Sequence, residues 1–143
     1  MSVQDDIVTR PRPEMDPTTT PYWESAGHGV LTLQWCAHCS HFIHAPMSRC
    51  WRCHRSTGLE WREVSGRGVI HSFIVIHNSR LPGFGGRGPH VVAMVEIEEQ
   101  DHVFMFANVL GAEPGDVAVG DRVEVTFDET IDGITIPQFR IIA

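Results

Sequence analysis

The four cysteines of the chain fall within one short segment, and their spacing limits what this segment can become. Cys36, Cys39, Cys50 and Cys53 follow the pattern C-x2-C-x10-C-x2-C. Each C-x2-C pair can form a tight knuckle, and two facing knuckles place four thiolates at the corners of a tetrahedron that suits zinc. We therefore expect a structural zinc site, because four thiolate ligands leave no open position for water or substrate.

Other uses of these cysteines fit the sequence less well. A thioredoxin-like redox pair needs one C-x2-C at a helix start, not two pairs joined by a short hairpin. Two disulfides need an oxidising compartment, which nothing in the sequence indicates. A Cys3His site with one free cysteine stays open, because His38, His41 and His44 lie within the segment and His54 follows it.

Short apolar alternations flank the knuckles. "VLTLQW" at residues 30–35 and "HFIHAP" at residues 41–46 predict two short strands, which is the layout of a zinc ribbon. A ribbon of this size buries little surface, so metal binding supplies much of its folding free energy. Ahead of it, Thr20 and Pro21 predict an N-cap and the first residue of a brief helix.

After Gly58 the apolar residues alternate with a period of two, which predicts strands. A long first strand at residues 59–77 is interrupted at Ser65 and Gly66, where we expect a bulge. Four further strands are expected at residues 90–98, 102–110, 122–129 and 135–142. Five strands with a long, bent first strand favour an OB-fold barrel, with an SH3-like barrel as the nearest competitor.

These patterns predict a mainly β chain with a short N-terminal helix, a zinc ribbon and then a five-stranded OB-fold barrel. We expect a flexible N-terminal arm at residues 1–19, the helix and ribbon at 20–58 and the OB-fold at 59–143. The segment "GFGGRG" at residues 83–88 matches a dinucleotide-binding pattern, but a proline and a strand follow it instead of a helix. We therefore reject a dinucleotide site there.

Charge is distributed unevenly along the chain. The net charge of −7 argues against broad attraction to nucleic acid. All 11 basic residues are arginines, and seven of them lie between residues 49 and 87, opposed by two acidic residues. Residues 96–132 contain 11 acidic residues and one arginine. The basic stretch is either a differently solvated surface or an anion-facing patch, because arginine can grip a phosphate with two hydrogen bonds.

Neither a targeting segment nor a catalytic constellation is visible. The first residues are polar, and no apolar run approaches the roughly 20 residues that a membrane helix needs, so we expect a cytoplasmic protein without membrane contact. The sequence has no G-x-S-x-G or H-E-x-x-H pattern, and every cysteine is assigned to metal. Standalone catalysis is therefore not expected.

The ribbon spacing and the strand pattern together resemble a known family. The stretches that carry the resemblance run from Tyr22 to Arg140 and are "YWESAGHGVLTLQWCAHC", "EWREVSGRGVIHSFIVIH", "PHVVAMVEIE", "VGDRVEVTF" and "IPQFR". The chain resembles acyl-CoA-associated proteins that combine a rubredoxin-like zinc ribbon with an OB-fold. His90 departs from the pattern, since an aromatic residue such as tyrosine is expected after the proline.

The resemblance implies a non-catalytic accessory subunit of a hetero-oligomer. Its partner would be a thiolase-like acyl-CoA enzyme, such as a thiolase or an aldolase of steroid side-chain breakdown; other family members accompany MaoC-like hydratases. The subunit would stabilise that enzyme and help to form its acyl-CoA site, in lipid or steroid side-chain degradation. The alternatives are a module that binds single-stranded nucleic acid and a small standalone hydrolase or thioesterase.

Two sets of contact residues are candidates within this interpretation. The loop at residues 78–90 carries Arg80 and Arg87, which we expect to contact CoA phosphates, with Arg67 behind them. The large apolar residues expected to dock on the partner are Tyr22, Trp23 and Phe84. Packing of Tyr22 and Trp23 on the ribbon is the other interpretation of that pair.

Overall fold

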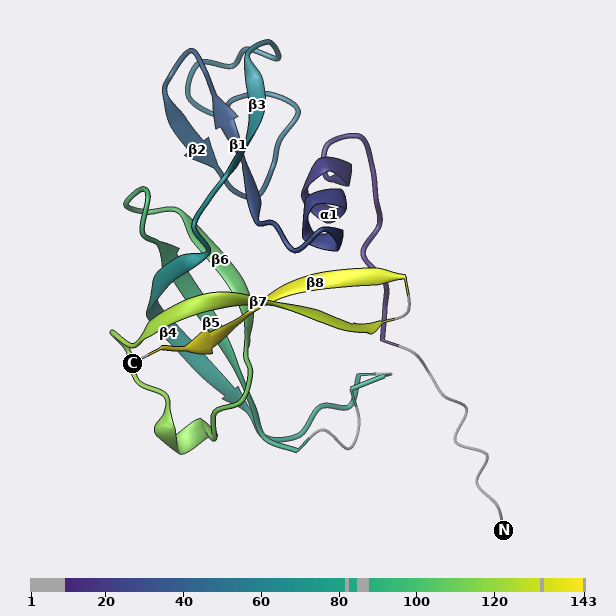
Figure 1. Cartoon of the computed structure of the whole chain (residues 1–143), viewed down its shortest axis with the longest axis vertical. Helices are drawn as coiled ribbons and strands as arrows, with labels where there is room; N and C mark the ends of the chain where they lie inside the picture. The colour runs from purple at the N-terminus through teal and green to yellow at the C-terminus, as the bar shows by residue number, and fades with distance from the viewer. Residues whose placement is uncertain (1–9, 82, 85–87, 132, 143) are drawn as a thin grey trace.

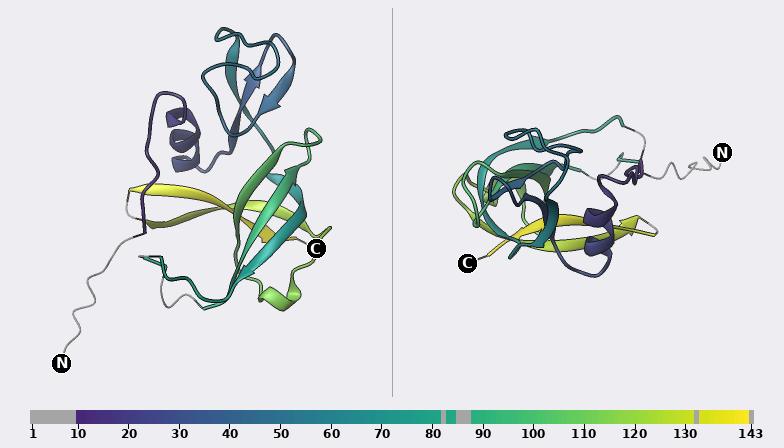
Figure 2. Two further views of the ribbon diagram at one scale, coloured as in Figure 1. Left: turned by 180° about the vertical axis from the view of Figure 1, so that it is seen from behind. Right: turned by 90° about the horizontal axis from the view of Figure 1, so that it is seen from above.

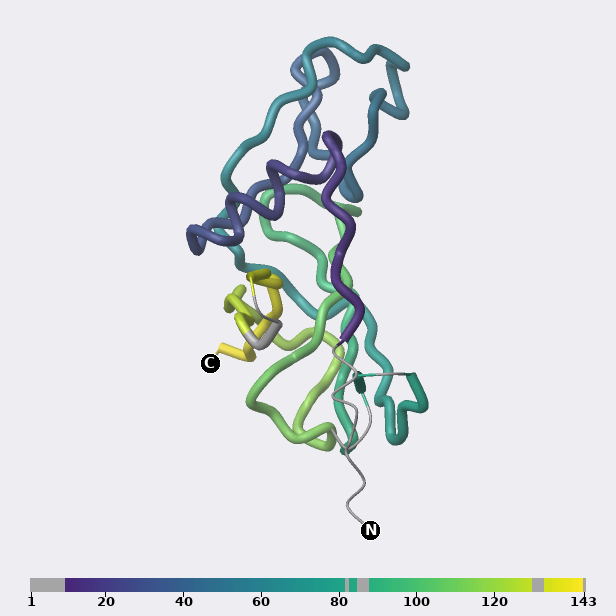
Figure 3. Tube along the Cα trace, turned by 90° about the vertical axis from the view of Figure 1, so that its right-hand side faces the viewer, coloured from purple at the N-terminus to yellow at the C-terminus, as the bar shows by residue number. Residues whose placement is uncertain are grey.

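The protein consists of a ribbon sheet stacked on one end of a β-barrel, with a short helix beside their junction (Figures 1 and 3). The structure is a computed structural model that describes residues 10–81, 83, 84, 88–131 and 133–142. Arg87, one of the expected phosphate contacts, lies outside these residues. The mainly β fold class is confirmed.

The helix α1 spans Thr20–Gly27 and begins one residue earlier than expected. Thr19, and not Thr20, is its N-cap residue, and Thr19 makes no capping hydrogen bond through its side chain. The carboxylate of Asp16 instead accepts hydrogen bonds from the backbone amides of Thr18 and Thr19, at 2.8 and 2.9 Å. The Asp16 side chain therefore orders the turn that leads into the helix.

The ribbon sheet has three antiparallel strands in the order β2-β1-β3. They are β1 (Thr32–Cys36), β2 (His41–Ile43) and β3 (Leu59–Glu63). Leu31 and Leu33 at the start of β1 are buried in the core of the barrel, whereas Cys36 belongs to a second small core with Ile43 and Cys50. One strand thus connects the two cores.

The expected long first strand is in fact two strands in two sheets. Residues 59–63 form β3 and pair with β1, and the chain passes Gly66 before β4 (Arg67–Ile76) enters the barrel. Gly66 has a positive φ of +80°, which suits this change of direction. The bulge expected near Gly66 lies instead within β4, between Ile70 and Ser72. The division into domains at residues 58 and 59 stays a prediction.

The barrel is closed and five-stranded, in the order β4-β5-β6-β8-β7. Its other strands are β5 (His90–Ile97), β6 (Phe104–Val109), β7 (Arg122–Ile131) and β8 (Ile134–Ile141), and the short 3₁₀ helix η1 (Pro114–Asp116) precedes β7. Alternate residues of β5 point inward, because Val91, Ala93 and Val95 are buried while their neighbours are half-buried. Phe139 from β8 fills the centre of this core.

The barrel is closed between β6 and β8 by a very short stretch of strand pairing. These two strands run parallel and are paired at one position, Val109 with Phe139. Beyond that position the β7–β8 hairpin extends away from the barrel towards α1, which packs on β8 (Figures 1 and 2). The separation of β6 and β8 leaves room for the groove described below. No helix in the described part of the chain has the length and hydropathy of a membrane span.

Candidate metal centre and ligand groove

The four cysteines converge at the tip of the ribbon. Cys36 ends β1, Cys39 lies in the turn after it, and Cys50 and Cys53 come from the facing knuckle. Their four Sγ atoms lie within 4.8 Å of one another, and none of the cysteines forms a disulfide. The cluster can therefore hold a metal ion.

The distances within the cluster fit a tetrahedral thiolate site. Cys36 Sγ lies 3.8 Å from Cys53 Sγ, and Cys50 Sγ lies 3.9 Å from Cys39 Sγ. A zinc ion with Zn–S bonds of about 2.3 Å requires sulfur–sulfur separations of about 3.8 Å along each edge of the tetrahedron. The donor set and these two distances therefore match a zinc site.

The protein environment shifts the pKa values of the cysteine thiols in different directions. Burial opposes ionisation of Cys50, but hydrogen bonds from the backbone amides of Cys53 and Arg52 outweigh it and lower the Cys50 pKa well below the usual thiol range. The Arg52 amide lies 3.4 Å from Cys50 Sγ. Burial, followed by hydrogen bonds with the other three thiols, raises the pKa of Cys39. Metal binding would therefore release protons, chiefly from the thiols that stay protonated in the free site.

Of the histidines of this segment, His41 lies beside the sulfur cluster. His41 Nε2 lies 3.5 Å from Cys50 Sγ, and its ring stacks on Trp51 with 5.1 Å between the ring centroids. His38 Nδ1 lies 2.9 Å from Arg55 Nη1, outside the cluster. All four sulfurs converge, so His41 sits beside the set of sulfurs instead of replacing one of them.

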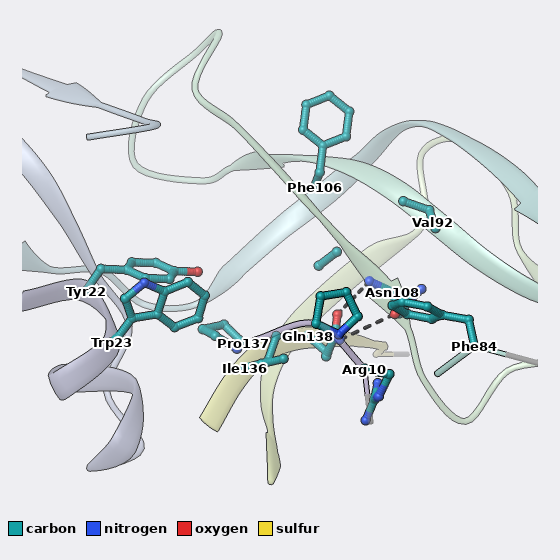
Figure 4. A pocket seen from close by; sticks show the side chains of 12 residues that line it. Arg10, Tyr22, Trp23, Phe84, Val92, Phe106, Asn108, Ile136, Pro137 and Gln138 are labelled. Carbon is teal, nitrogen blue, oxygen red and sulfur yellow. Dashed lines mark hydrogen bonds between the residues drawn. The ribbon is translucent and has the colours of Figure 1, made fainter. Parts of the chain in front are cut away.

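A groove of about 300 Å³ runs along the gap between β6 and β8 (Figure 4). Tyr22 and Trp23 from α1 line one end, and Phe84 from the loop after β4 lines the other. Phe106 stands over the groove from β6. The structure thus brings the three expected docking residues, which are far apart in the sequence, to the wall of one groove.

Two side-chain amides form the polar base of the groove. Gln138 is buried, and its Oε1 accepts a hydrogen bond from the backbone amide of Asn108 at 2.6 Å. Asn108 Nδ2 in turn donates to the carbonyl oxygen of Val91 at 3.1 Å. The Gln138 side chain therefore takes the place of a neighbouring strand where β6 and β8 separate, and it fixes the base of the groove.

Aromatic contacts hold the helix end of the groove. The rings of Tyr22 and Trp23 meet edge to face at 4.9 Å, and Tyr22 also lies 5.9 Å from the ring of His44 on the ribbon. Burial raises the pKa of Tyr22 and lowers the pKa of His44 to about 4. Tyr22 is thus largely a packing residue, whereas Trp23 presents its indole to the groove.

Of the expected phosphate contacts, Arg67 and Arg80 lie among the described residues, and they do not lie together. Arg80 is exposed in the loop after β4, whereas Arg67 begins β4, so a strand about 30 Å long separates them. Arg67 Nη2 lies 2.7 Å from Glu98 Oε1, and the bonded Arg67 lowers the pKa of Glu98. Arg67 is therefore engaged on the barrel surface, away from the groove and the loop.

Several groove residues were not expected from the sequence. Phe106 and Ile136 read as ordinary strand residues, and Asn108 and Gln138 are polar residues within apolar strands. A polar side chain within an apolar strand indicates a hydrogen bond to another part of the chain, but the sequence does not identify the second residue. The structure identifies it, because it shows that β6 and β8 separate.

Comparison with known proteins places this architecture in a family. A family model described as "ChsH2, C-terminal OB-fold domain" matches residues 61–128. A DUF35 domain-containing scaffold protein of Methanothermobacter thermautotrophicus is 34% identical over 114 residues, a match that covers 77% of this chain and 84% of that protein. The chain belongs to the DUF35 family. The resemblance drawn from the cysteine spacing and the strand pattern is thereby confirmed.

DUF35 proteins that resemble this chain also occur within enzyme assemblies. A chain of the solved Ltp2-ChsH2(DUF35) aldolase matches with a TM-score of 0.80 and 30% identity, over 91% of this chain and 98% of that one. The probable enoyl-CoA hydratase alpha subunit of Thermomonospora curvata is 32% identical over 92% of this chain. The 3-oxo-4,17-pregnadiene-20-carboxyl-CoA hydratase alpha subunit of Mycobacterium tuberculosis is 34% identical over 88% of it. This chain spans only 40% and 39% of the lengths of those two subunits.

Proposed function

We propose that this DUF35 chain is a non-catalytic accessory subunit that binds and stabilises a thiolase-like acyl-CoA enzyme, in lipid or steroid side-chain degradation. The observation that carries the proposal is the match to nearly the whole of a chain in the Ltp2-ChsH2(DUF35) aldolase. The names of the two hydratase subunits, one of which acts on a steroid carboxyl-CoA, point to the same substrate class.

The ribbon contributes structure to this role. Cys36, Cys39, Cys50 and Cys53 would hold zinc, since their sulfur–sulfur distances fit its tetrahedral geometry. When bound, the ion would cross-link the two knuckles. Its four cysteine ligands would leave no coordination position open. The four cysteines therefore fix the shape of a sheet that is too small to be stable by burial alone.

The groove is where we propose that the subunit helps to form the acyl-CoA site. Its aromatic walls suit an apolar acyl chain, and the amides of Asn108 and Gln138 at its base suit polar groups of a pantetheine arm. Arg80 and Arg87 belong to the loop that also carries Phe84, so they would contact CoA phosphates at that end. Arg67 has no place in this arrangement, because it pairs with Glu98 elsewhere.

Co-expression tests the proposal directly. The chain is produced with each thiolase-like acyl-CoA enzyme of its own organism in turn, and the complexes are measured by light scattering and by the activity of the enzyme. We expect one enzyme to form a complex of fixed stoichiometry and to gain solubility or turnover from it. Release of CoA from an acyl-CoA by the isolated chain, or the absence of any complex, would refute the proposal.

A further inference from the structure

The strands β4, β5 and β6 are apolar on both faces, which is unusual for a barrel strand that faces solvent. In β7 the exposed Arg122 and Glu124 alternate with the buried Val123, as expected when one face meets the core and the other meets water. The other three strands instead contain nearly continuous apolar runs, "FIVI" in β4, "VVAMV" in β5 and "FMFANV" in β6, beside the polar residues His71, Ser72 and Glu96. Such runs are typical of strands that are buried on both sides.

The outward side chains of these strands form one continuous surface, which we call the outer sheet face. Strand pairing aligns Ile74 with Val92, Met94 with Phe106, and Phe104 with Glu96, and directly paired residues project to the same side. The five apolar residues that define the outer sheet face are Ile74, Val92, Met94, Phe104 and Phe106. The three strands lie side by side in the barrel (Figure 2).

The centre of the outer sheet face is open to solvent. Phe106 is 72% exposed and Ile74 is 61% exposed, although both are large apolar side chains on regular strands. Val92 and Met94, which lie between them on β5, are half-buried and also apolar. An apolar patch that crosses three paired strands marks an interaction surface. The outer sheet face therefore needs a cover that the described part of this chain does not supply.

The charged residues at the two ends of the outer sheet face indicate which charges a partner protein must carry. The described part of the loop from residue 77 to 89, which leaves one end of β4 and β5, contains Arg80 and no acidic residue. The turn at residues 98–101, at the other end of β5, contains three acidic residues, and Arg67 neutralises one of them. A matching partner therefore has an apolar patch with carboxylates beside the loop and basic groups beside the turn.

We propose that the outer sheet face is the surface that docks on the acyl-CoA enzyme, an inference that rests on the accessory role proposed above. Val92 and Phe106 belong both to this face and to the lining of the groove, so a protein seated here also covers the mouth of the groove. An enzyme in that position would share the groove with its own acyl-CoA site. A second copy of this chain would cover the face but would bring no reacting group to the groove.

Two oppositely charged substitutions test the surface without disturbing the core. Ile74→Lys combined with Phe106→Glu places charges at the exposed centre, while Val119→Glu alters a residue that is 65% exposed outside the face. Because all three side chains are exposed, we expect thermal unfolding of each variant to resemble that of the wild type. Phe106→Ser provides a milder change should the double variant fail to fold.

Affinity for the co-expressed thiolase-like enzyme is then measured by calorimetry. We expect the double variant to weaken binding about 100-fold or more, as for central residues of an interface. Val119→Glu should leave binding within about threefold, because Val119 lies outside the face. Unchanged binding by the double variant would overturn the docking surface and leave the accessory function intact. If the wild type binds no such enzyme, both proposals fail. A dimer of the isolated wild type that the double variant disperses would assign the face to a second copy and overturn the inference.

Discussion

His44 makes the packing of the helix on the ribbon dependent on pH. Its ring lies against Tyr22 of α1, and burial lowers its pKa from 6.5 to about 4. As the pH falls below 6.5, the unfolded chain takes up a proton at His44 that the folded chain excludes until about pH 4. The free energy of unfolding therefore decreases over this range, and the stabilisation is complete only above it.

We predict that His44→Phe removes this dependence. Between pH 7 and pH 5 the wild type should lose about 2 kcal/mol more than the variant, since the unfolded chain alone binds the proton over most of that range. Urea unfolding at the two pH values measures the difference, and the shared loss from protonation of the cysteines cancels in the comparison. Equal losses for the two proteins would contradict the prediction.

Single residues differ in how much the sequence reveals about them. The four cysteines could be assigned from spacing, because knuckle geometry is local and four thiolates suit one kind of site. Tyr22, Trp23 and Phe84 were singled out by their size, but their convergence on one groove depends on how the helix and the loop pack on the barrel. The hydrogen bond from Asn108 to Gln138 depends on the separation of two strands, which no local pattern encodes.

At the scale of elements, the chain leaves the ribbon sheet and enters the barrel at Gly66. A Cβ atom there would collide with the side chain of Val125, and the φ of +80° is strained for any other residue. We predict that Gly66→Ala costs about 2 kcal/mol or more of the free energy of unfolding. Gly115→Ala is the control, because a Cβ at that glycine meets nothing within 4 Å.

Denaturant unfolding of the two glycine variants measures this difference. Gly115→Ala should change the stability by no more than about 0.5 kcal/mol, as is usual for an open surface position. A Gly66→Ala protein as stable as the control would show that the crossing between the sheets tolerates a side chain. The backbone of this crossing would then be less constrained than its φ indicates.

The strand positions could be predicted better than the strand partners. The period of two located four of the five barrel strands to within a few residues, because alternation is a local property of strands that face the core. The same period continues through residues 59–76, so it does not reveal that the chain changes sheet at Gly66. Pairing of β3 with β1 is decided by contacts between segments more than 20 residues apart, which alternation does not encode.

The ribbon should depend on its metal ion more than the barrel does. We predict that Cys50→Ser reduces bound zinc from about one ion per chain to nearly none, since three thiolates hold the ion much less tightly than four. Amide hydrogen exchange should then accelerate across residues 37–58, whereas Leu33 and the barrel strands stay protected by the main core. Ser48→Ala, at an exposed position of the same segment, is the control. Equal exchange in the two variants would contradict a structural role for the ion.

At the scale of the whole molecule, the charge pattern separates two functions that this architecture could serve. A barrel that binds single-stranded nucleic acid needs a positively charged groove with stacking aromatic residues. The groove of this chain has the aromatic residues, but β6 and β7 lie within residues 96–132, which contain 11 acidic residues and one arginine. This balance favours a protein partner and an apolar ligand over a polyanion.

One side chain of the barrel is hydrogen-bonded to the edge of the ribbon sheet. Gln100, in the turn between β5 and β6, accepts a hydrogen bond from the Phe42 amide at 2.8 Å and approaches the Phe42 carbonyl oxygen at 3.5 Å. It thus pairs with the open edge of β2 as a strand would. We predict that Gln100→Ala lowers the free energy of unfolding by about 1 kcal/mol and selectively accelerates exchange of the Phe42 amide, because this amide loses its acceptor. Hydrogen exchange followed by NMR measures the effect, with Asp101→Ala, a change at the exposed neighbour, as the control. If both variants left Phe42 equally protected, this side chain would not hold the ribbon on the barrel, and the packing of Leu31 and Leu33 in the main core would be the stronger link.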